Sequence, residues 1–284
     1  MVRQAEIYLV GSSINGFGRL TSDADLCLVI DPKSNTVKRK IVLDLLRKLK
    51  SLLHNAHFVR NLQLIFATVP ILKFTDSISG MECDFNVNNL TGIRNTFLLL
   101  AYARCDPRVR PMVLCIKEWA HSNDINSAQY GTLSSYALVL MILHYLQNVK
   151  PCVIPSLQAI HEDEFTSFTK VQTMFEKISN LPVIRSENRS PVSELMKGFF
   201  KYFSQFDFVN KVISIRLGMS YHVARTADPR LWMKKCLKIE EPFDLSNVAR
   251  AVQTGKKFDK IKSCIRNANI ALRNENLRTI IPQL

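Results

Sequence analysis

Two acidic residues, Asp23 and Asp25, stand two positions apart at the head of the apolar stretch Leu26–Ile30. This stretch has the length and composition of a buried β-strand. Residues two apart in a strand project from the same face, so both carboxylates can point toward one site. Carboxylate oxygens are the ligands that Mg²⁺ prefers in proteins. The spacing predicts a divalent-metal site, although an ordinary polar turn would also explain this short motif taken alone.

A third carboxylate is available on another predicted strand, within the stretch MECDFNV. Asp84 is the better candidate there, and Glu82, which shares its strand face, is the reserve. Three carboxylates that hold two Mg²⁺ ions suit nucleotidyl transfer, because one ion activates a hydroxyl and the other stabilises the departing pyrophosphate. Asp23, Asp25 and Asp84 are therefore the predicted catalytic and metal-binding residues.

Gly11 and Ser12 come upstream of this pair, directly after the apolar stretch Glu6–Val10. Glycine lets the backbone approach a ligand closely. Exposed N–H groups and serine hydroxyls at a helix start suit a phosphate. The surrounding glycines match neither GxGxxG nor a P-loop, so the predicted phosphate contact is of another kind.

The elements that must position these residues fall into two groups. Up to about residue 90 the pattern mixes strands and helices, and beyond Asn89 it becomes helical. We expect strands at Glu6–Val10, Leu26–Ile30, Asn61–Val69 and Met81–Val87, and helices at Val37–Leu53, Ile93–Tyr102, Thr132–Leu146, Val192–Phe206 and Phe258–Asn276, with one more opening at Asp106. The sequence thus predicts an α+β fold, with a small domain over residues 1–90 that contains a mixed β-sheet and flanking helices, and a larger, mainly helical domain over residues 91–284.

Composition restricts the partners and excludes some sites. The chain has 284 residues, 47% hydrophobic, and its longest purely apolar run is too short for a bilayer span, which favours a soluble protein. Its seven cysteines are scattered singly, which fits a reducing compartment rather than a disulfide framework or a zinc site. The His54 and His57 pair has no Cys or His cluster beside it and is interpreted as a helix-surface pair.

The formal net charge is +14, and residues 181–284 carry 19 Lys and Arg against 9 Asp and Glu. A basic chain commonly binds a polyanion such as nucleic acid, although a soluble surface with a basic bias is the simpler alternative.

The stretch VGSSINGFGRLTSDADLCLVI resembles the signature of the DNA polymerase β-like nucleotidyltransferase superfamily. The likeness continues through ECDFNVNNLTGIRNTFLLLAYARCDPRVRPMVLCIKEWA, GTLSSYALVLMILHYLQ and IEEPFDLSNVARAV. Together these stretches look like the cytoplasmic non-canonical poly(A) polymerases of the germline-development-defective type. The resemblance implies a nucleotidyltransferase domain, a poly(A) polymerase-associated helical domain and an active site in the cleft between them.

By this likeness Asp23, Asp25 and Asp84 bind the metal ions, and Asp84 is the base toward the primer 3′-hydroxyl. Gly11 and Ser12 hold the triphosphate. The other nucleotide-binding positions that the likeness implies are Asn95, Lys117, His121, Ser135, Tyr136, Glu241 and Asp244.

Several of these positions have a plain structural explanation as well. Without the likeness, Asn95 is a helix-surface asparagine, Lys117 a snorkelling lysine and Tyr136 a core tyrosine. With it, Asn95 contacts the sugar, Lys117 pairs with phosphates and Tyr136 stacks on the base. His121 departs from relatives that carry a second lysine at its position, and Glu241 and Asp244 lie near the base edge.

Uridine-adding relatives often carry a histidine between the positions of Ser246 and Asn247, and this chain has none. The smaller side chains leave room for a purine, so we predict ATP over UTP. The expected activity is template-independent addition of AMP to mRNA 3′ ends with Mg²⁺ or Mn²⁺, in the cytoplasm with a possible nuclear pool. The expected partners are an RNA 3′ end and a separate RNA-binding protein, because no RNA-recognition motif is evident; neither DNA nor a membrane is expected.

Three alternative functions remain. A terminal uridylyltransferase would differ only in base choice, and a catalytically inactive scaffold would keep the fold and bind RNA or protein. A small-molecule nucleotidyltransferase is disfavoured by the long helical half and the basic C-terminal third. The chain starts almost at the first catalytic strand, whereas relatives usually have preceding helices, so we expect either a fragment or a short gene model.

Overall fold

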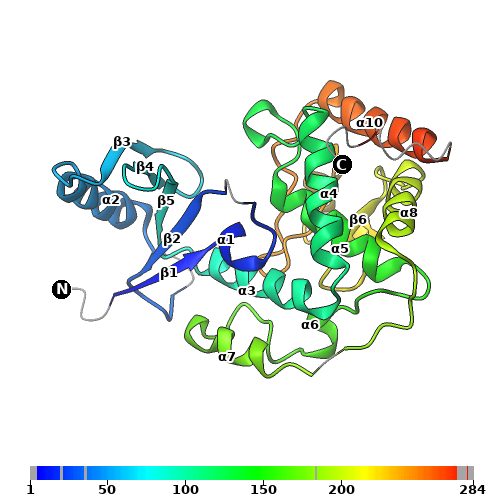
Figure 1. The fold of residues 1–284 in the computed structure, drawn as a ribbon, viewed down its shortest axis with the longest axis horizontal. Helices are drawn as coiled ribbons and strands as arrows, with labels where there is room; N and C mark the ends of the chain where they lie inside the picture. The colour runs from blue at the N-terminus through cyan, green and yellow to red at the C-terminus, as the bar shows by residue number, and fades with distance from the viewer. Residues whose placement is uncertain (1–4, 20–21, 35–36, 183, 274–279, 281–284) are drawn as a thin grey trace. The chain divides into compact units, whose positions relative to one another are not determined.

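The computed structural model describes residues 5–19, 22–34, 37–182, 184–273 and 280 (Figure 1). The strands are β1 (Glu6–Val10), β2 (Ala24–Val29), β3 (Val59–Ile65), β4 (Ile71–Asp76), β5 (Glu82–Val87), β6 (Lys211–Ser214) and β7 (Met219–His222). The α-helices are α1 (Ser12–Asn15), α2 (Arg39–Leu53), α3 (Leu90–Cys105), α4 (Val109–Ser122), α5 (Ser135–Asn148), α6 (Leu157–Ile160), α7 (Met174–Ser179), α8 (Val192–Ser204), α9 (Pro229–Met233) and α10 (Gly255–Arg273).

The chain forms two compact units. Unit 1 comprises residues 1–103 and 163–182, and unit 2 comprises residues 104–162 and 183–284. The expected boundary at residue 90 falls at the start of α3, and most of α3 lies in unit 1. Two hydrogen bonds explain this: the Gly11 N–H donates to Thr96 Oγ1 at 2.9 Å, and the Arg94 Nε donates to the Thr169 carbonyl at 3.0 Å.

Strands β1 to β5 form one mixed sheet in the order β1-β2-β5-β4-β3. The pairing of β2 with β5 is parallel and the other pairings are antiparallel, which confirms the predicted α+β class with a mixed sheet. The predicted strand Asn61–Val69 is shorter in the structure, because β3 ends at Ile65 and the chain turns back through Pro70 into β4. Strand β4 was missed by the sequence analysis.

The core of unit 1 lies between α2 and one face of this sheet. Val42 and Leu46 of α2 pack with alternate residues of β4 and β5, including Leu72, Phe74 and Phe85. Because side chains alternate between the faces of a strand, the residues between these apolar positions project to the opposite face. That face carries the acidic residues considered below.

The core of unit 2 is built around α5, whose residues from Ala137 to Gln147 are all buried. This confirms the expectation of a central helix that is apolar almost all round. Helices α4 and α8 pack against it, and α10 packs against α8. Trp119 of α4 meets Phe200 of α8 edge-on, with ring centroids 4.6 Å apart. Residues 274–276 of the predicted C-terminal helix lie outside the described residues.

Strands β6 and β7 form a short antiparallel hairpin in unit 2 that the sequence analysis did not predict. Each has four residues, which is too short for a clear alternating pattern. No helix among the described residues has both the length and the hydropathy that crossing a bilayer requires.

The two leucines Leu46 and Leu52 of α2 provide a matched test of this core. Leu46 is fully buried, whereas Leu52 is 76% exposed. We expect Leu46→Ala to lower the free energy of unfolding by about 3 kcal/mol, because it removes buried methyl groups and leaves a cavity. Leu52→Ala should change it by less than about 0.5 kcal/mol. Denaturant unfolding of both variants checks this, and equal losses would contradict the assigned core.

Candidate functional site

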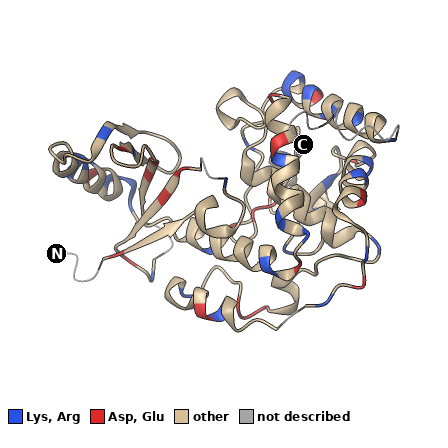
Figure 2. Cartoon of the chain, in the orientation of Figure 1, with Lys and Arg blue, Asp and Glu red and all other residues tan. Residues whose placement is uncertain are grey.

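The predicted carboxylates come together on unit 1 because β2 runs parallel to β5. In this pairing Asp25 stands opposite Asp84, and Asp23 precedes β2 by one residue. Asp84 alternates with Cys83 and Phe85, whose side chains belong to the core, so its carboxylate projects from the face opposite α2. The structure thus brings the two predicted strands side by side in the register that the chemistry needs. Figure 2 shows acidic residues on the strands of this unit.

The electrostatic environment of these carboxylates is unfavourable for their charged forms. Burial, together with the negative charges of Asp84 and Asp23, raises the pKa of Asp25 to about 6. Burial also raises the pKa of Asp84, to which the nearby carboxylates of Asp23 and Glu82 contribute. A group of like charges that raise one another's pKa is held together by the fold at a cost in stability.

Lys73 of β4 supplies positive charge to this group and was not predicted. Its ammonium forms an ion pair with Glu82 and lies 3.8 Å from Asp23 Oδ2 and 3.9 Å from Asp84 Oδ1. The hydrogen bond to Glu82 raises the pKa of Lys73. A signal existed in the sequence, because Lys73 is the charged residue between two apolar residues of the stretch ILKFTD.

One oxygen of this carboxylate group lacks a hydrogen bond. Asp84 Oδ1 is buried and has no hydrogen-bond donor. As the side chains lie, the described residues contain no group of three His, Cys, Asp or Glu side chains that could hold a metal ion. The donor set itself, which consists only of carboxylate oxygens, suits Mg²⁺ or Mn²⁺.

Position 11 requires glycine, because its backbone lies against the Asp25 carboxylate. Its φ is +73°, and a Cβ atom there would lie 1.9 Å from Asp25 Oδ2. The Gly11 N–H donates to Thr96 Oγ1, so it is already used within the fold. Gly11 therefore acts by admitting the Asp25 carboxylate against the backbone. Thr96, which the sequence analysis missed, carries no recognisable signal in its helical stretch.

The serines after Gly11 occupy the short helix α1. Ser12 is half-buried, and Ser13 is exposed and donates its hydroxyl to the Asp23 carbonyl at 2.8 Å. That bond ties the start of α1 to the residue that precedes β2, so the glycine-serine turn and the aspartate pair are fixed to each other. Asn95 is half-buried on α3, in the same unit.

The remaining predicted residues belong to unit 2. Lys117 is buried on α4, and His121 is exposed in the last turn of the same helix. Ser135 begins α5, and its hydroxyl donates to Asn126 Oδ1 at 3.2 Å. Each unit therefore carries its own group of predicted residues: Gly11, Ser12, Asp23, Asp25, Asp84 and Asn95 in unit 1, and Lys117, His121, Ser135, Tyr136, Glu241 and Asp244 in unit 2.

Tyr136 and Glu241 contact each other directly, although they are far apart in the sequence. The Tyr136 hydroxyl donates to Glu241 Oε1 at 3.2 Å. Burial of this hydroxyl, with the charge of Glu241, raises the pKa of Tyr136, which keeps it protonated as a donor. Glu241 Oε2 accepts the backbone N–H of Phe243 at 2.7 Å and that of Asp244. Glu241 thus orders both the tyrosine and its own loop.

Asp244 is exposed, and its Oδ1 accepts the N–H of Ser246 at 2.8 Å. Asn247 is occupied by the backbone: its Oδ1 accepts the N–H of Ile239, and its Nδ2 donates to the Leu237 carbonyl. The segment 239–247 is therefore a closed turn in which Asp244 remains the accessible acidic side chain.

Two protein-family models match the chain. Residues 1–104 match the central palm domain of the mitochondrial-like poly(A) RNA polymerases, and residues 191–247 match the Cid1 family poly A polymerase model. The first match ends next to the end of α3, close to where unit 1 gives way to unit 2.

Curated relatives agree with these models. The chain is 45% identical over 283 residues to poly(A) RNA polymerase GLD2-B of Xenopus laevis, covering 98% of this chain and 55% of the relative. It is 43% identical over 290 residues to poly(A) RNA polymerase GLD2 of Homo sapiens, covering 98% of this chain and 58% of the relative. The chain thus spans little more than half the length of these relatives.

Solved structures match at the level of the fold and the sequence. A structure of a GLD-2/RNP-8 complex matches with a TM-score of 0.81 and 33% identity, covering 98% of this chain and 85% of that chain. The Cid1 poly(U) polymerase with Mg and 3′-dATP bound matches with a TM-score of 0.77 and 29% identity, covering 98% and 84%. The chain belongs to the GLD2-type family of poly(A) RNA polymerases.

Proposed function

We propose that this chain adds AMP from ATP to the 3′ ends of RNA without a template. One observation carries the proposal: the parallel pairing of β2 with β5 places Asp25 opposite Asp84, with Asp23 two residues upstream. Membership of the GLD2-type family supports the reaction class, since the matched relatives are named poly(A) RNA polymerases.

We infer that Asp23, Asp25 and Asp84 hold Mg²⁺ or Mn²⁺. Three features of unit 1 support the fit: the donors are all carboxylate oxygens, burial and the neighbouring carboxylates raise the pKa of Asp25, and Asp84 Oδ1 is buried without a hydrogen-bond donor. When bound, the ions supply charge stabilisation for the attacking hydroxyl and the departing pyrophosphate. Lys73 then keeps its ion pair with Glu82, outside the ligand set.

Asp84 is proposed as the proton acceptor. The 3′-hydroxyl oxygen of the RNA forms a bond to the α-phosphorus of ATP, the bond from that phosphorus to the bridging oxygen breaks, and pyrophosphate leaves. The hydroxyl proton passes to the Asp84 carboxylate. Burial raises the pKa of this group, which makes it a better base than an exposed aspartate. Asp23 and Asp25 would hold the metal ions in position and balance part of their positive charge, and they transfer no proton.

The nucleotide contacts are proposed as follows. Ser12 offers a hydroxyl to the triphosphate next to Gly11, whose own N–H is used by Thr96. Asn95 contacts the sugar, and Lys117 with His121 supplies positive charge for the phosphates. Tyr136 stacks on the base, held by its hydroxyl bond to Glu241. Glu241 orders the loop, and its exposed acidic residue Asp244 reads the base edge near Ser135. The absence of a histidine between Ser246 and Asn247 favours the purine.

The RNA is proposed to be held through basic surface and a protein partner, in the cytoplasm. Figure 2 shows Lys and Arg along α10, and such contacts weaken as salt rises. Solved relatives include GLD-2 in complexes with RNP-8 and with GLD-3, which supports a protein partner for this chain.

The assigned base can be separated from its neighbour on β5. Asp84→Asn should lower the rate of AMP addition to labelled oligo(A) RNA at least about 1,000-fold, a loss of about 4 kcal/mol of transition-state stabilisation. Glu82→Gln serves as the matched control and should retain activity within about tenfold, because it pairs with Lys73. A larger loss in Glu82→Gln than in Asp84→Asn would overturn the assignment of Asp84.

Base choice is tested with each nucleoside triphosphate separately in the same primer-extension assay. Wild-type protein should extend oligo(A) faster with ATP than with UTP, because no histidine stands between Ser246 and Asn247. Faster uridine addition would identify a terminal uridylyltransferase. No addition of any nucleotide, at Mg²⁺ and at Mn²⁺, would identify an inactive scaffold.

Asp25→Asn should stabilise the metal-free protein at pH 7.5 while abolishing activity. The pKa of Asp25 is about 6 in the folded state against 3.8 ordinarily, so its contribution to folding is lost as the pH rises from 3.8 to about 6. Thermal unfolding in EDTA should show the gap between variant and wild type opening over this range. Added Mg²⁺ should raise the midpoint of the wild type only.

Asp44→Asn, on the exposed surface of α2, is the matched control and should show neither effect. A Mg²⁺ shift equal in wild type and Asp25→Asn would show that the ion binds elsewhere.

A further inference from the structure

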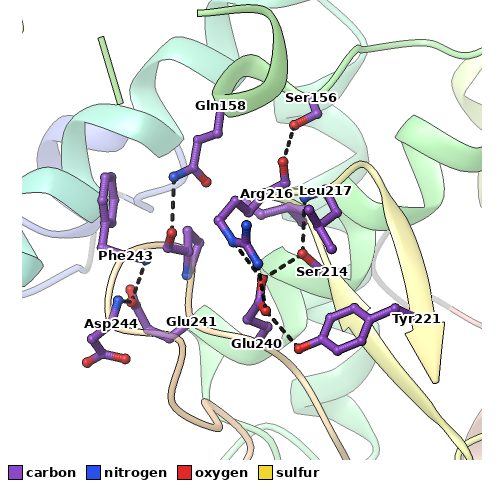
Figure 3. A network of polar contacts seen from close by, with 12 residues as sticks. Ser156, Gln158, Ser214, Arg216, Leu217, Tyr221, Glu240, Glu241, Phe243 and Asp244 are labelled. Carbon is purple, nitrogen blue, oxygen red and sulfur yellow. Dashed lines mark hydrogen bonds and ion pairs between the residues drawn. The ribbon is translucent and has the colours of Figure 1, made fainter. Parts of the chain in front are cut away.

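We propose that Glu240 is a positioning residue for base selection, which together with Ser214, Arg216 and Tyr221 fixes the segment that carries Glu241 and Asp244. The inference rests on the proposed function, in which that segment reads the base. Glu240 belongs to unit 2, as do its three partners, and the four side chains form one network (Figure 3).

The Glu240 carboxylate is 4% exposed, and both its oxygens are satisfied. Its Oε1 accepts the Ser214 hydroxyl at 2.7 Å and the Arg216 Nε at 3.0 Å. Its Oε2 accepts a second Arg216 nitrogen at 3.0 Å and the Tyr221 hydroxyl at 2.7 Å. A buried charge is tolerated only with such pairing, so the position of this carboxylate is set by four donors at once.

The backbone of Glu240 is fixed to the same hairpin. Its N–H donates to the Ile213 carbonyl at 2.8 Å, and the Ile213 N–H donates to the Lys238 carbonyl at 3.0 Å. The hairpin is held in turn, since the Ser156 hydroxyl donates to the Arg216 carbonyl at 2.6 Å. Main chain and side chain of Glu240 therefore tie the segment 239–247 to β6 and β7.

The neighbouring residue faces the other way. Figure 3 shows Glu240 directed toward Arg216 and Tyr221, and Glu241 toward Phe243 and Asp244. Glu241 bonds with Tyr136 and with the loop N–H groups, as described above. Adjacent side chains in extended backbone project to opposite sides. Since one peptide unit links Glu240 to Glu241, a shift of Glu240 moves Glu241 with it. The network thus reaches the base-reading side chains through a single peptide unit.

A purely structural role makes a different prediction. If Glu240 only stabilised unit 2, loosening its bonds would lower the melting temperature and leave base choice unchanged. If it positions the reading segment, loosening its bonds changes the ratio of ATP to UTP use. The two roles therefore separate on nucleotide discrimination, measured beside stability.

Two graded variants and one matched control decide between these roles. Tyr221→Phe removes one hydroxyl from Glu240, and Glu240→Gln removes the charge while keeping the shape. Leu46→Ala is the control, because it lowers stability through the core of unit 1, whereas the Glu240 network belongs to unit 2. All three are compared by melting temperature and by kcat and KM for ATP and UTP on oligo(A) RNA.

We expect the ATP-to-UTP ratio of kcat/KM to fall about fivefold in Tyr221→Phe and about tenfold in Glu240→Gln, mainly through a higher KM for ATP. Leu46→Ala should keep the wild-type ratio despite its loss of melting temperature. An unchanged ratio in Tyr221→Phe overturns the inference, and this milder variant decides alone if Glu240→Gln does not fold.

The inference and the proposed function fail in different ways. A wild-type protein that adds no nucleotide, and that binds neither ATP nor UTP by isothermal titration calorimetry, contradicts the proposed function and removes the basis of the inference. A wild-type protein that prefers ATP, with variants that keep the preference, contradicts the inference alone.

Discussion

The repulsion among carboxylates at one face of a five-stranded sheet is the constraint on which unit 1 depends. The register of β2 against β5 sets Asp25 beside Asp84, and both are half-buried, so water screens their charges less than it screens a surface aspartate. Burial and the two neighbouring carboxylates together raise the pKa of Asp25. A fold that places like charges together retains them only if the rest of the unit is stable enough to hold the register.

The opposite face of the same strands supplies that stability. Leu72, Phe74 and Phe85 alternate with the charged positions and pack against α2, so any slip of the register by one residue would exchange apolar and acidic faces. Lys73 compensates part of the negative charge from the strand next to β5. Gly11 completes the arrangement, since any side chain at that position would occupy the space of the Asp25 carboxylate.

Much of this could be predicted because the patterns were local. The alternation around Asp84 and the two-residue spacing of Asp23 and Asp25 gave the strand faces directly, and the apolar run in α5 gave the buried helix. Strand β4 was hidden because its six residues follow β3 after a short turn. The partners Thr96, Glu240 and Arg216 depend on contacts between distant segments, and single residues in a sequence carry no mark of such contacts. Long-range pairing also explains why residues 163–182 join unit 1.

Because residues 163–182 belong to unit 1, that unit cannot be cut out of the chain as one contiguous piece. Arg94 is buried, and its Nε reaches the Thr169 carbonyl, seventy-five positions later along the chain. A protein cut after α3 would keep Arg94 but lose Thr169, so the guanidinium would be exposed without its acceptor. Independent expression of the aspartate-bearing half would therefore need two pieces of polypeptide, joined by a linker that replaces residues 104–162, rather than one contiguous fragment.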